Sequence, residues 1–200
     1  MRSVAAFALI TLLSLFATST VNAQRAADKP AIISRSDWGA KPPVGEGKKH
    51  EVKYITIHHT ATKMRPDLSI QTKLKNLQAF SQRDDKLASG KLKPAWFDIP
   101  YHYYISVDGK IGEGREIEYA GDTNTEYDPA GHALIVVEGS FGTDEPTKEQ
   151  VASLKAMVVW LSKIYKVQGD KLKGHNDYAT TGCPGENLKK LLPELRQLVK

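Results

Sequence analysis

The chain has 200 residues, of which 40% are apolar and 26% are charged, and this composition is typical of one globular domain with short extensions. It excludes a disordered chain, a coiled coil and an assembly of several domains. The 28 Lys and Arg residues outnumber the 23 Asp and Glu residues, which gives a net charge of +5. This excess is mild and lacks the clustered basic stripe of nucleic-acid-binding proteins, so we expect no nucleic acid partner.

Residues 1–23 have the three parts of a secretory signal peptide. A basic residue precedes an apolar run from Val4 to Phe16, and small residues follow it. The run is shorter than the roughly 20 residues of a membrane span, which disfavours an uncleaved anchor. We expect cleavage before Gln24, a linker over residues 24–31 and one domain over residues 32–200. The mature protein is expected to be periplasmic or secreted, without a membrane contact.

The first predicted elements of the domain are a strand, a helix and a loop. Residues Lys53 to His59 alternate in the manner of a buried strand. Asp67 is a candidate helix cap. Apolar residues recur after it at helical spacing, at Ile70, Leu74, Leu77 and Phe80. The segment from Asp84 to Trp96 is expected to be a long loop with a solvated basic stretch over residues 86–93.

The remaining elements are a hairpin, a strand and two helices. The turn Asp108-Gly109 joins the two strands of the predicted hairpin, residues 101–107 and 110–113. Residues 134–138 predict a further strand. A capping box at Thr147 to Gln150 opens a helix that reaches Tyr165, and a last helix covers residues 187–198. This order predicts an α/β (α+β) domain, a central mixed sheet flanked by about three helices.

The chain has a single cysteine, Cys183, so an intramolecular disulfide is excluded. It lies in a Gly-Cys-Pro-Gly turn soon after His175, and imidazole and thiolate are both zinc ligands. The spacing equally fits a buried, unreactive cysteine near a surface histidine. A third ligand would come from the end of the predicted strand, where His58 and His59 point to opposite faces. The pattern does not choose between them.

Five segments occur in an order that carries a resemblance over about Ile32 to Leu192. They are Ile33 to Ala40, Ile57 to Ala61, Asp98 to His102, Asp108 to Arg115, and Gly174-His175 followed by Cys183-Pro184-Gly185. Each segment alone is weakly specific. Taken together and in this order, they resemble the type 2 N-acetylmuramoyl-L-alanine amidases, which include peptidoglycan recognition proteins and amidase-type phage lysozymes.

This resemblance implies a zinc ion at the rim of the sheet, held by His58, His175 and Cys183. It also implies that Tyr101 and Thr181 are catalytic residues, which donate hydrogen bonds to a developing oxyanion. Two neutral imidazoles and one thiolate leave a fourth tetrahedral position for water, as in catalytic zinc sites. Members of the family that only recognise peptidoglycan often carry serine at the cysteine position, so Cys183 favours catalysis.

The implied reaction is hydrolysis of the amide bond between N-acetylmuramoyl and L-alanine, with peptidoglycan or muropeptides as substrate. The alternative is a non-catalytic peptidoglycan-binding receptor that uses the same groove. A general secreted zinc peptidase is disfavoured because the sequence has no His-Glu-x-x-His segment. The general base is not assigned. The resemblance implies that some relatives use a glutamate at the position of Val136, and Glu138 lies two residues further along the same face of the strand. Glu138 is therefore a candidate, and a structural role is its simpler interpretation. Nothing requires a second subunit, so we expect a monomer.

Other histidines and one tryptophan have simpler interpretations. His59 is expected to pack beside the site, and His102 to face away from Tyr101. We expect His132 in a loop before its strand and His50 in solvent. Trp96 is expected to pack in the core or at its rim, although an indole can also stack on a sugar face.

Overall fold

The computed structural model describes residues 29–87 and 89–199. The predicted signal peptide and most of the predicted linker lie outside these residues. The chain from Ala31 onward forms one compact unit. In the described part of the chain, every helix is too short or too polar to cross a membrane.

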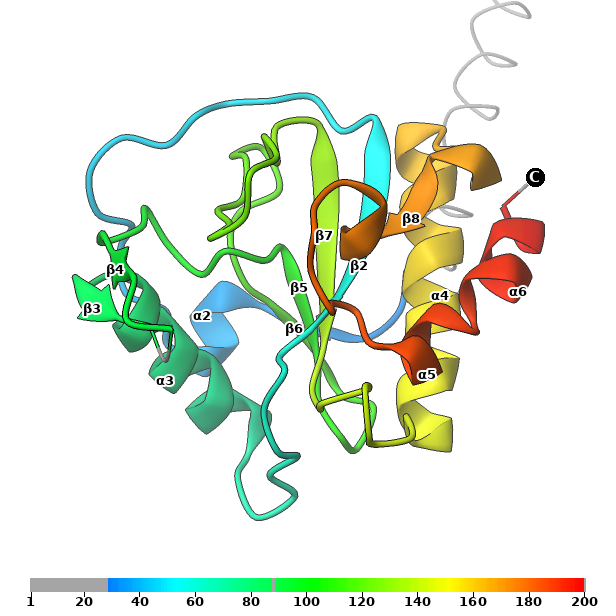
Figure 1. Cartoon of the computed structure of the whole chain (residues 1–200), viewed down its shortest axis with the longest axis horizontal. Coiled ribbons are helices and arrows are strands. Elements are labelled where there is room, and N and C mark those ends of the chain that lie inside the picture. Colours follow the sequence, from blue (N-terminus) through cyan, green and yellow to red (C-terminus); the bar gives the residue numbers. More distant parts are fainter. Residues whose placement is uncertain (1–28, 88, 200) are drawn as a thin grey trace, which may run out of the picture. The chain divides into compact units, whose positions relative to one another are not determined.

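A six-stranded mixed sheet lies at the centre of this unit (Figure 1). The strand order is β1-β6-β5-β7-β2-β8. All neighbouring strands are parallel except β5 and β6, which form the predicted hairpin. The strands are β1 (Ile32–Ile33), β2 (Tyr54–His59), β5 (Tyr103–Ile105), β6 (Ile111–Glu113), β7 (His132–Val137) and β8 (Leu172–Gly174). The sheet confirms the predicted mixed architecture.

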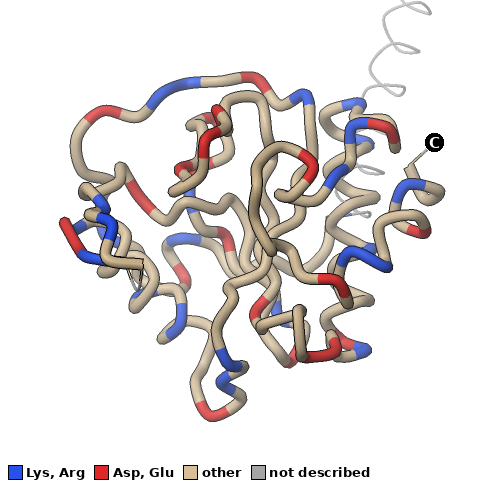
Figure 2. Tube along the Cα trace, viewed as in Figure 1, with Lys and Arg blue, Asp and Glu red and all other residues tan. Residues whose placement is uncertain are grey.

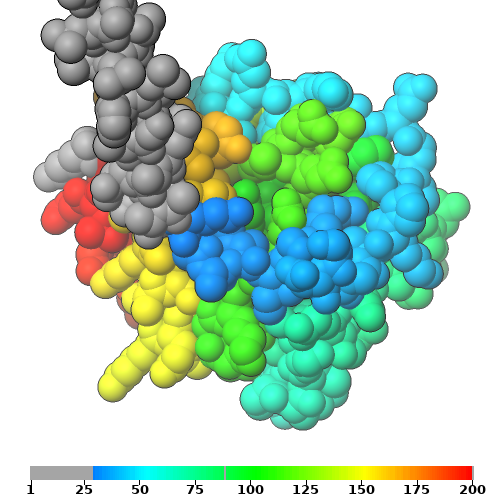
Figure 3. All heavy atoms as spheres, turned by 180° about the vertical axis from the view of Figure 1, so that it is seen from behind, coloured from blue at the N-terminus to red at the C-terminus, as the bar shows by residue number. Residues whose placement is uncertain are grey.

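Helices cover both faces of the sheet (Figure 1). One face packs against α4 (Lys148–Tyr165), α5 (Glu186–Lys189) and α6 (Leu192–Gln197). The other face packs against α2 (Arg35–Trp38) and α3 (Ile70–Ser81). From behind, the segment that contains α2 is seen between α4 and α3 (Figure 3).

Side-chain alternation in β2 assigns its residues to these two faces. Ile55 and Ile57 belong to the core under α4. Thr56 and His58 therefore point to the opposite face, which is the face that carries α3. There, α3 lies close to β6, where Gly112 makes room for Leu74 because a Cβ would lie 2.5 Å from that side chain. Loops, not a helix, cover the β2 and β8 end of this face, and the candidate site lies under them.

Of the two predicted helix caps, the one at the start of α4 is confirmed and the one at the start of α3 is wrong. Thr147 and Gln150 form the predicted capping box of α4, each side chain accepting a hydrogen bond from the other's backbone N–H. The cap of α3 is Ser69, whose hydroxyl accepts from the N–H of Thr72, and not Asp67. The Asp67 carboxylate instead binds Arg65 at 2.6 Å.

The segment predicted as a long loop contains a small hairpin, β3 (Asp85–Lys86) and β4 (Leu92–Lys93). In the basic stretch that was expected to be solvated, Lys86 and Lys91 are exposed, but Lys93 is buried, which corrects the expectation at that residue. Its ammonium group donates to the carbonyl oxygens of Ser81, Arg83 and Pro94. Carbonyl groups at a helix end lack partners within the helix, so the lysine satisfies what the end of α3 leaves open.

The last predicted helix is interrupted. It consists of α5 and α6, and Pro193 lies in the first turn of α6, where its missing N–H costs no hydrogen bond. Basic and acidic residues are interspersed along the described trace (Figure 2).

Candidate metal centre

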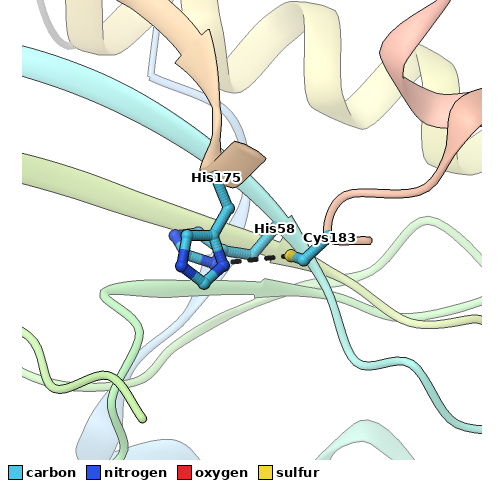
Figure 4. A group of neighbouring side chains, drawn as sticks. All are labelled: His58, His175 and Cys183. Atoms are coloured by element: carbon cyan, nitrogen blue, oxygen red, sulfur yellow. Dashed lines mark hydrogen bonds between the residues drawn. The ribbon is translucent and has the colours of Figure 1, made fainter. Parts of the chain in front are cut away.

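The three predicted zinc ligands come from the ends of two neighbouring strands and from one turn (Figure 4). His58 lies near the end of β2, and His175 follows β8 directly, in the short 3-10 helix η2 (His175–Asp177). Because β2 and β8 are parallel, with Ile57 beside Gly174, the two histidines leave the sheet at the same edge. Cys183 lies in the turn before α5.

Local backbone contacts fix the turn that carries Cys183. Its carbonyl accepts from the N–H of Asn176 at 2.9 Å, and the peptide bond to Pro184 is cis. Gly185 has a φ of 87°, and a Cβ there would lie 2.3 Å from the backbone of Phe141. Only glycine fits this position. The turn places the sulfur within 3.4 Å of the His59 backbone nitrogen, which donates to it.

The donor atoms lie close enough together to converge on one metal ion. The Sγ atom of Cys183 lies 3.6 Å from Nδ1 of His58, and the rings of His58 and His175 have centroids 4.5 Å apart. One ligand atom from each residue lies within 4.8 Å of the others. Zinc bonds of about 2.3 Å to sulfur and about 2.1 Å to nitrogen at a tetrahedral angle place those atoms about 3.6 Å apart. The residues therefore fit a zinc ion.

Burial sets the ionisation of these ligands. It lowers the pKa of His58 well below its ordinary value and lowers that of His175 to about 4, so both imidazoles are neutral at pH 7. Burial also raises the pKa of the Cys183 thiol to about 12, although the His59 N–H opposes this. Neutral imidazoles are ready to bind a metal. The thiol requires a cation nearby to release its proton at neutral pH.

Tyr101 and Thr181 lie on the wall of the same cavity, whose volume is about 460 Å³. The Tyr101 ring centroid is 5.3 Å from that of His58. Burial raises the pKa of its phenol, which therefore stays protonated and can donate a hydrogen bond. The Thr181 hydroxyl accepts from the Cys183 N–H at 3.2 Å. The fold thus brings all five predicted site residues to one cavity.

Glu138 lies outside this group of cavity residues. Its carboxylate is buried and binds Lys73 at 2.7 Å, together with three further donors from Arg65, Ser106 and Val107. Val136 is the position with which Glu138 was compared as a candidate base, and its side chain belongs to the core under α3. These contacts give Glu138 a structural role.

The other histidines are held by hydrogen bonds. His59 Nδ1 accepts from the Phe141 N–H, so this histidine packs beside the site. His102 is fully buried between the Leu134 N–H and the Tyr119 carbonyl. The expectation for His132 is wrong, because it is the buried first residue of β7 and not a loop residue. His50 is also not simply solvated, since its ring binds the Ile117 carbonyl and the Gly131 N–H.

Sequence reasoning missed two residues that contact the candidate ligand histidines, His58 and His175. Thr125 Oγ1 lies 2.8 Å from His175 Nε2, and the Tyr127 hydroxyl lies 3.4 Å from His58 Nε2. Both residues come from an irregular loop, where no hydrophobic period or motif marks them. Trp96 lines the same cavity and lies under the ammonium group of Lys93, 4.5 Å from its ring centroid, so the expected packing in the core or at its rim stays a prediction.

Fold and site together define a mixed α/β domain with a candidate metal centre at the carboxyl ends of the neighbouring strands β2 and β8. The family model Amidase_2, described as N-acetylmuramoyl-L-alanine amidase, matches residues 48–186. The chain therefore belongs to the N-acetylmuramoyl-L-alanine amidase family.

Other known relatives are described as peptidoglycan-recognition proteins. The chain is 31% identical to peptidoglycan-recognition protein SD of Drosophila simulans over 171 residues, 82% of this chain and 84% of the relative. The crystal structure of Drosophila peptidoglycan recognition protein SD matches with a TM-score of 0.70 at 29% identity, over 83% of this chain and 95% of that one. The N-acetylmuramoyl-L-alanine amidase LysC of Clostridium intestinale matches with a TM-score of 0.65 over 84% and 98% of the two chains. Its identity of 24% supports the fold alone. These relatives associate the chain with peptidoglycan.

Proposed function

We propose that the protein is a zinc-dependent N-acetylmuramoyl-L-alanine amidase that acts on peptidoglycan or muropeptides. The observation that carries this proposal is the convergence of His58, His175 and Cys183 on the wall of one cavity, with a candidate ligand atom from each within 4.8 Å of the others. A site with three protein ligands keeps its fourth position for water or substrate, which is the arrangement of a catalytic zinc centre.

A zinc ion bound there would supply Lewis acid chemistry, by acidifying a water molecule and polarising an amide carbonyl. The chain's own residues orient the substrate. The Tyr101 phenol and the Thr181 hydroxyl donate hydrogen bonds to the lactyl carbonyl oxygen as it gains negative charge. Water adds to the carbonyl carbon, the C–N bond breaks, and the L-alanine nitrogen leaves with a proton.

The chain's own residues bring little net charge to the cavity, so a bound zinc ion would set the charge that a substrate meets there. Among the described residues that line the cavity, Asp122 carries the only carboxylate, and Arg115 binds it. The two histidines are neutral at pH 7. A zinc dication with one thiolate would leave one net positive charge at the reacting carbonyl, which stabilises the transition state of amide hydrolysis.

The test is digestion of purified sacculi by the mature chain, with chelator and with zinc added back, followed by mass spectrometry of the new termini. We expect free L-alanine amines on released stem peptides, and we expect chelator to abolish them. Zinc-dependent release of peptide cut elsewhere would identify a peptidase instead. A zinc-containing protein that binds muropeptides and releases no stem peptide would be a receptor.

The ligand assignment has its own test in Cys183→Ser. We expect this variant to lose bound zinc and hydrolysis together, because a serine hydroxyl is a poor ligand beside two imidazoles. Zinc content is measured by elemental analysis of purified protein. Zinc-dependent turnover retained in this variant would contradict the assignment.

We also propose that the protein is exported through the signal peptide over residues 1–23 and acts as a monomer in the periplasm or the medium. Sequencing of the mature amino terminus is expected to give Gln24. Light scattering of the purified mature protein is expected to give the mass of one chain. An intact amino terminus in exported protein, or a dimer mass, would contradict these two statements.

A further inference from the structure

The loop that precedes β7 presents two hydroxyl groups to the two candidate ligand histidines. Thr125 Oγ1 lies 2.8 Å from Nε2 of His175. The hydroxyl of Tyr127, two residues later, lies 3.4 Å from Nε2 of His58. In His58 the other ring nitrogen, Nδ1, faces the sulfur of Cys183. One loop therefore contacts both imidazoles, and on His58 it contacts the nitrogen that points away from the sulfur.

An imidazole that binds a metal through one nitrogen carries its proton on the other, and that N–H usually donates to a nearby acceptor. Hydroxyl oxygens can accept such a bond. We propose that Thr125 and Tyr127 are positioning residues of the metal centre. Their oxygens hold the proton of each histidine on Nε2 and so leave Nδ1 free for the metal. This inference rests on the proposed zinc site and concerns residues that act through the ligands.

The loop is anchored in a way that suits this role. Thr125 is held by Thr123, whose hydroxyl lies 2.7 Å from the Thr125 hydroxyl and accepts the Thr125 N–H at 3.1 Å. On the amino-terminal side of these residues, Asp122 binds the buried guanidinium of Arg115. On their carboxyl-terminal side, Asp128 binds Lys48 at 2.8 Å. Both ends of the loop are thereby tied to other parts of the fold.

The ring of Tyr127 adds a second restraint. Its centroid lies 5.2 Å from that of His175, and it stacks on Tyr178 at 5.6 Å. It also meets the ring of His132 edge-on at 5.4 Å. Tyr127 thus contacts His58 through its hydroxyl and His175 through its ring. Replacing it with phenylalanine removes only the hydroxyl, which separates the two contributions.

The first test uses Thr125→Val, which keeps the shape of the side chain and removes its hydroxyl, and Thr125→Ser, which keeps the hydroxyl. Zinc affinity is measured by competition with a chromophoric chelator, without substrate. We expect zinc affinity to fall about 10- to 100-fold in Thr125→Val. Thr125→Ser is expected to stay within threefold of the unsubstituted protein. A loss below threefold in Thr125→Val, or an equal loss in both variants, would overturn the proposal for Thr125.

The second test uses Tyr127→Phe, with Tyr103→Phe as the matched control, because Tyr103 lies in the core under α4 and packs against Trp160. We expect a loss of zinc affinity of more than threefold in Tyr127→Phe. The loss is expected to be smaller than in Thr125→Val because the hydrogen bond is longer. The control is expected to change zinc affinity less than twofold. Equal effects in the two variants would overturn the role of the Tyr127 hydroxyl.

A third measurement needs no variant. Long-range proton–nitrogen correlation spectra of the metal-free protein report which ring nitrogen of each histidine carries the proton. We expect the Nε2–H form for both His58 and His175, and the Nδ1–H form at either residue would overturn the assignment there.

The outcomes separate this inference from the proposed function. A protein that does not bind zinc at all contradicts the proposed function. A protein that binds zinc tightly and keeps that affinity without the two hydroxyl groups contradicts only the positioning role.

Discussion

Replacing Lys73 with methionine is expected to destabilise the protein by about 3 kcal/mol, because the change leaves the buried carboxylate of Glu138 without its cation. The two side chains are 6% and 3% exposed, and Nζ lies 2.7 Å from the carboxylate oxygen. Breaking such a pair costs about 3–5 kcal/mol. Three donors remain on the carboxylate, from Ser106 Oγ and from the backbone nitrogens of Val107 and Arg65, which favours the lower end of the range.

Urea unfolding at pH 7 measures this cost, and at this chain length the melting temperature is expected to fall by about 6–12 °C. The matched control is Lys155→Met, because Lys155 binds Glu194 at 2.5 Å on the surface. It is expected to change the free energy of unfolding by less than about 1 kcal/mol. Adding Glu138→Gln to Lys73→Met is expected to restore at least half of the loss, because the uncompensated charge is removed. A cost for Lys73→Met no greater than that of the control would refute this reasoning.

Three further predictions concern pH, the phenol and the cysteine turn. Burial lowers the pKa of His102 to about 3 and of His132 to about 4, so on acidification the unfolded chain takes up protons before the folded one. The free energy of unfolding of the metal-free protein should therefore fall as the pH is lowered from about 6.5 to about 4. From pH 7 to pH 5.5 we expect a loss of about 1.2 kcal/mol per histidine. A free energy from urea unfolding that does not change with pH in this range would contradict the prediction. Tyr101→Phe is expected to lower kcat about 100- to 1000-fold with zinc content unchanged, and a smaller loss in a sacculus digestion assay would count against a bond to the oxyanion. Gly185→Ala is expected to weaken zinc binding at least tenfold in the chelator competition assay, because its φ of 87° and the Phe141 backbone exclude a Cβ. Unchanged affinity would show that the turn adapts.

The sequence predicted the elements that have a clear period or cap. The alternation of β2, the apolar spacing of α3 and the Thr147 capping box of α4 all correspond to observed structure. It did not predict β1 and β8, which have two and three residues. Strands of that length are too short for alternation to be visible. The fold was therefore predictable as a class, while the full strand order was not.

The misplaced cap of α3 and the misjudged Lys93 have different causes. Asp67 and Ser69 are both suitable cap residues, and cap preference alone does not choose between them. In the structure Asp67 binds Arg65, only two residues away, and Ser69 caps the helix. Lys93 is charged and is buried where the end of α3 and the segment after it offer carbonyl oxygens. Its burial depends on contacts made in folding, which the charge pattern of the sequence does not show.

The convergence of the candidate site residues was predictable, and their surroundings were not. Alternation assigned His58 and His59 to opposite faces, and only the family resemblance chose His58. Thr125 and Tyr127 carry no pattern, since hydroxyl residues are common in irregular loops. A search for hydroxyl or carbonyl acceptors beside each ligand histidine in the folded chain is what identifies them.

The ionisation of the three candidate ligands determines how a divalent cation would bind in this cavity. Burial disfavours the charged form of each group in isolation, lowering the pKa of both histidines and raising that of the Cys183 thiol. A bound dication reverses the preference of the thiol, because the thiolate then faces a positive charge, and it leaves the neutral imidazoles unchanged. Metal binding should therefore release about one proton at pH 7, from the sulfur. The resulting net charge of one would be placed at the wall of the cavity, beside Tyr101 and Thr181, where an amide carbonyl would develop its negative charge.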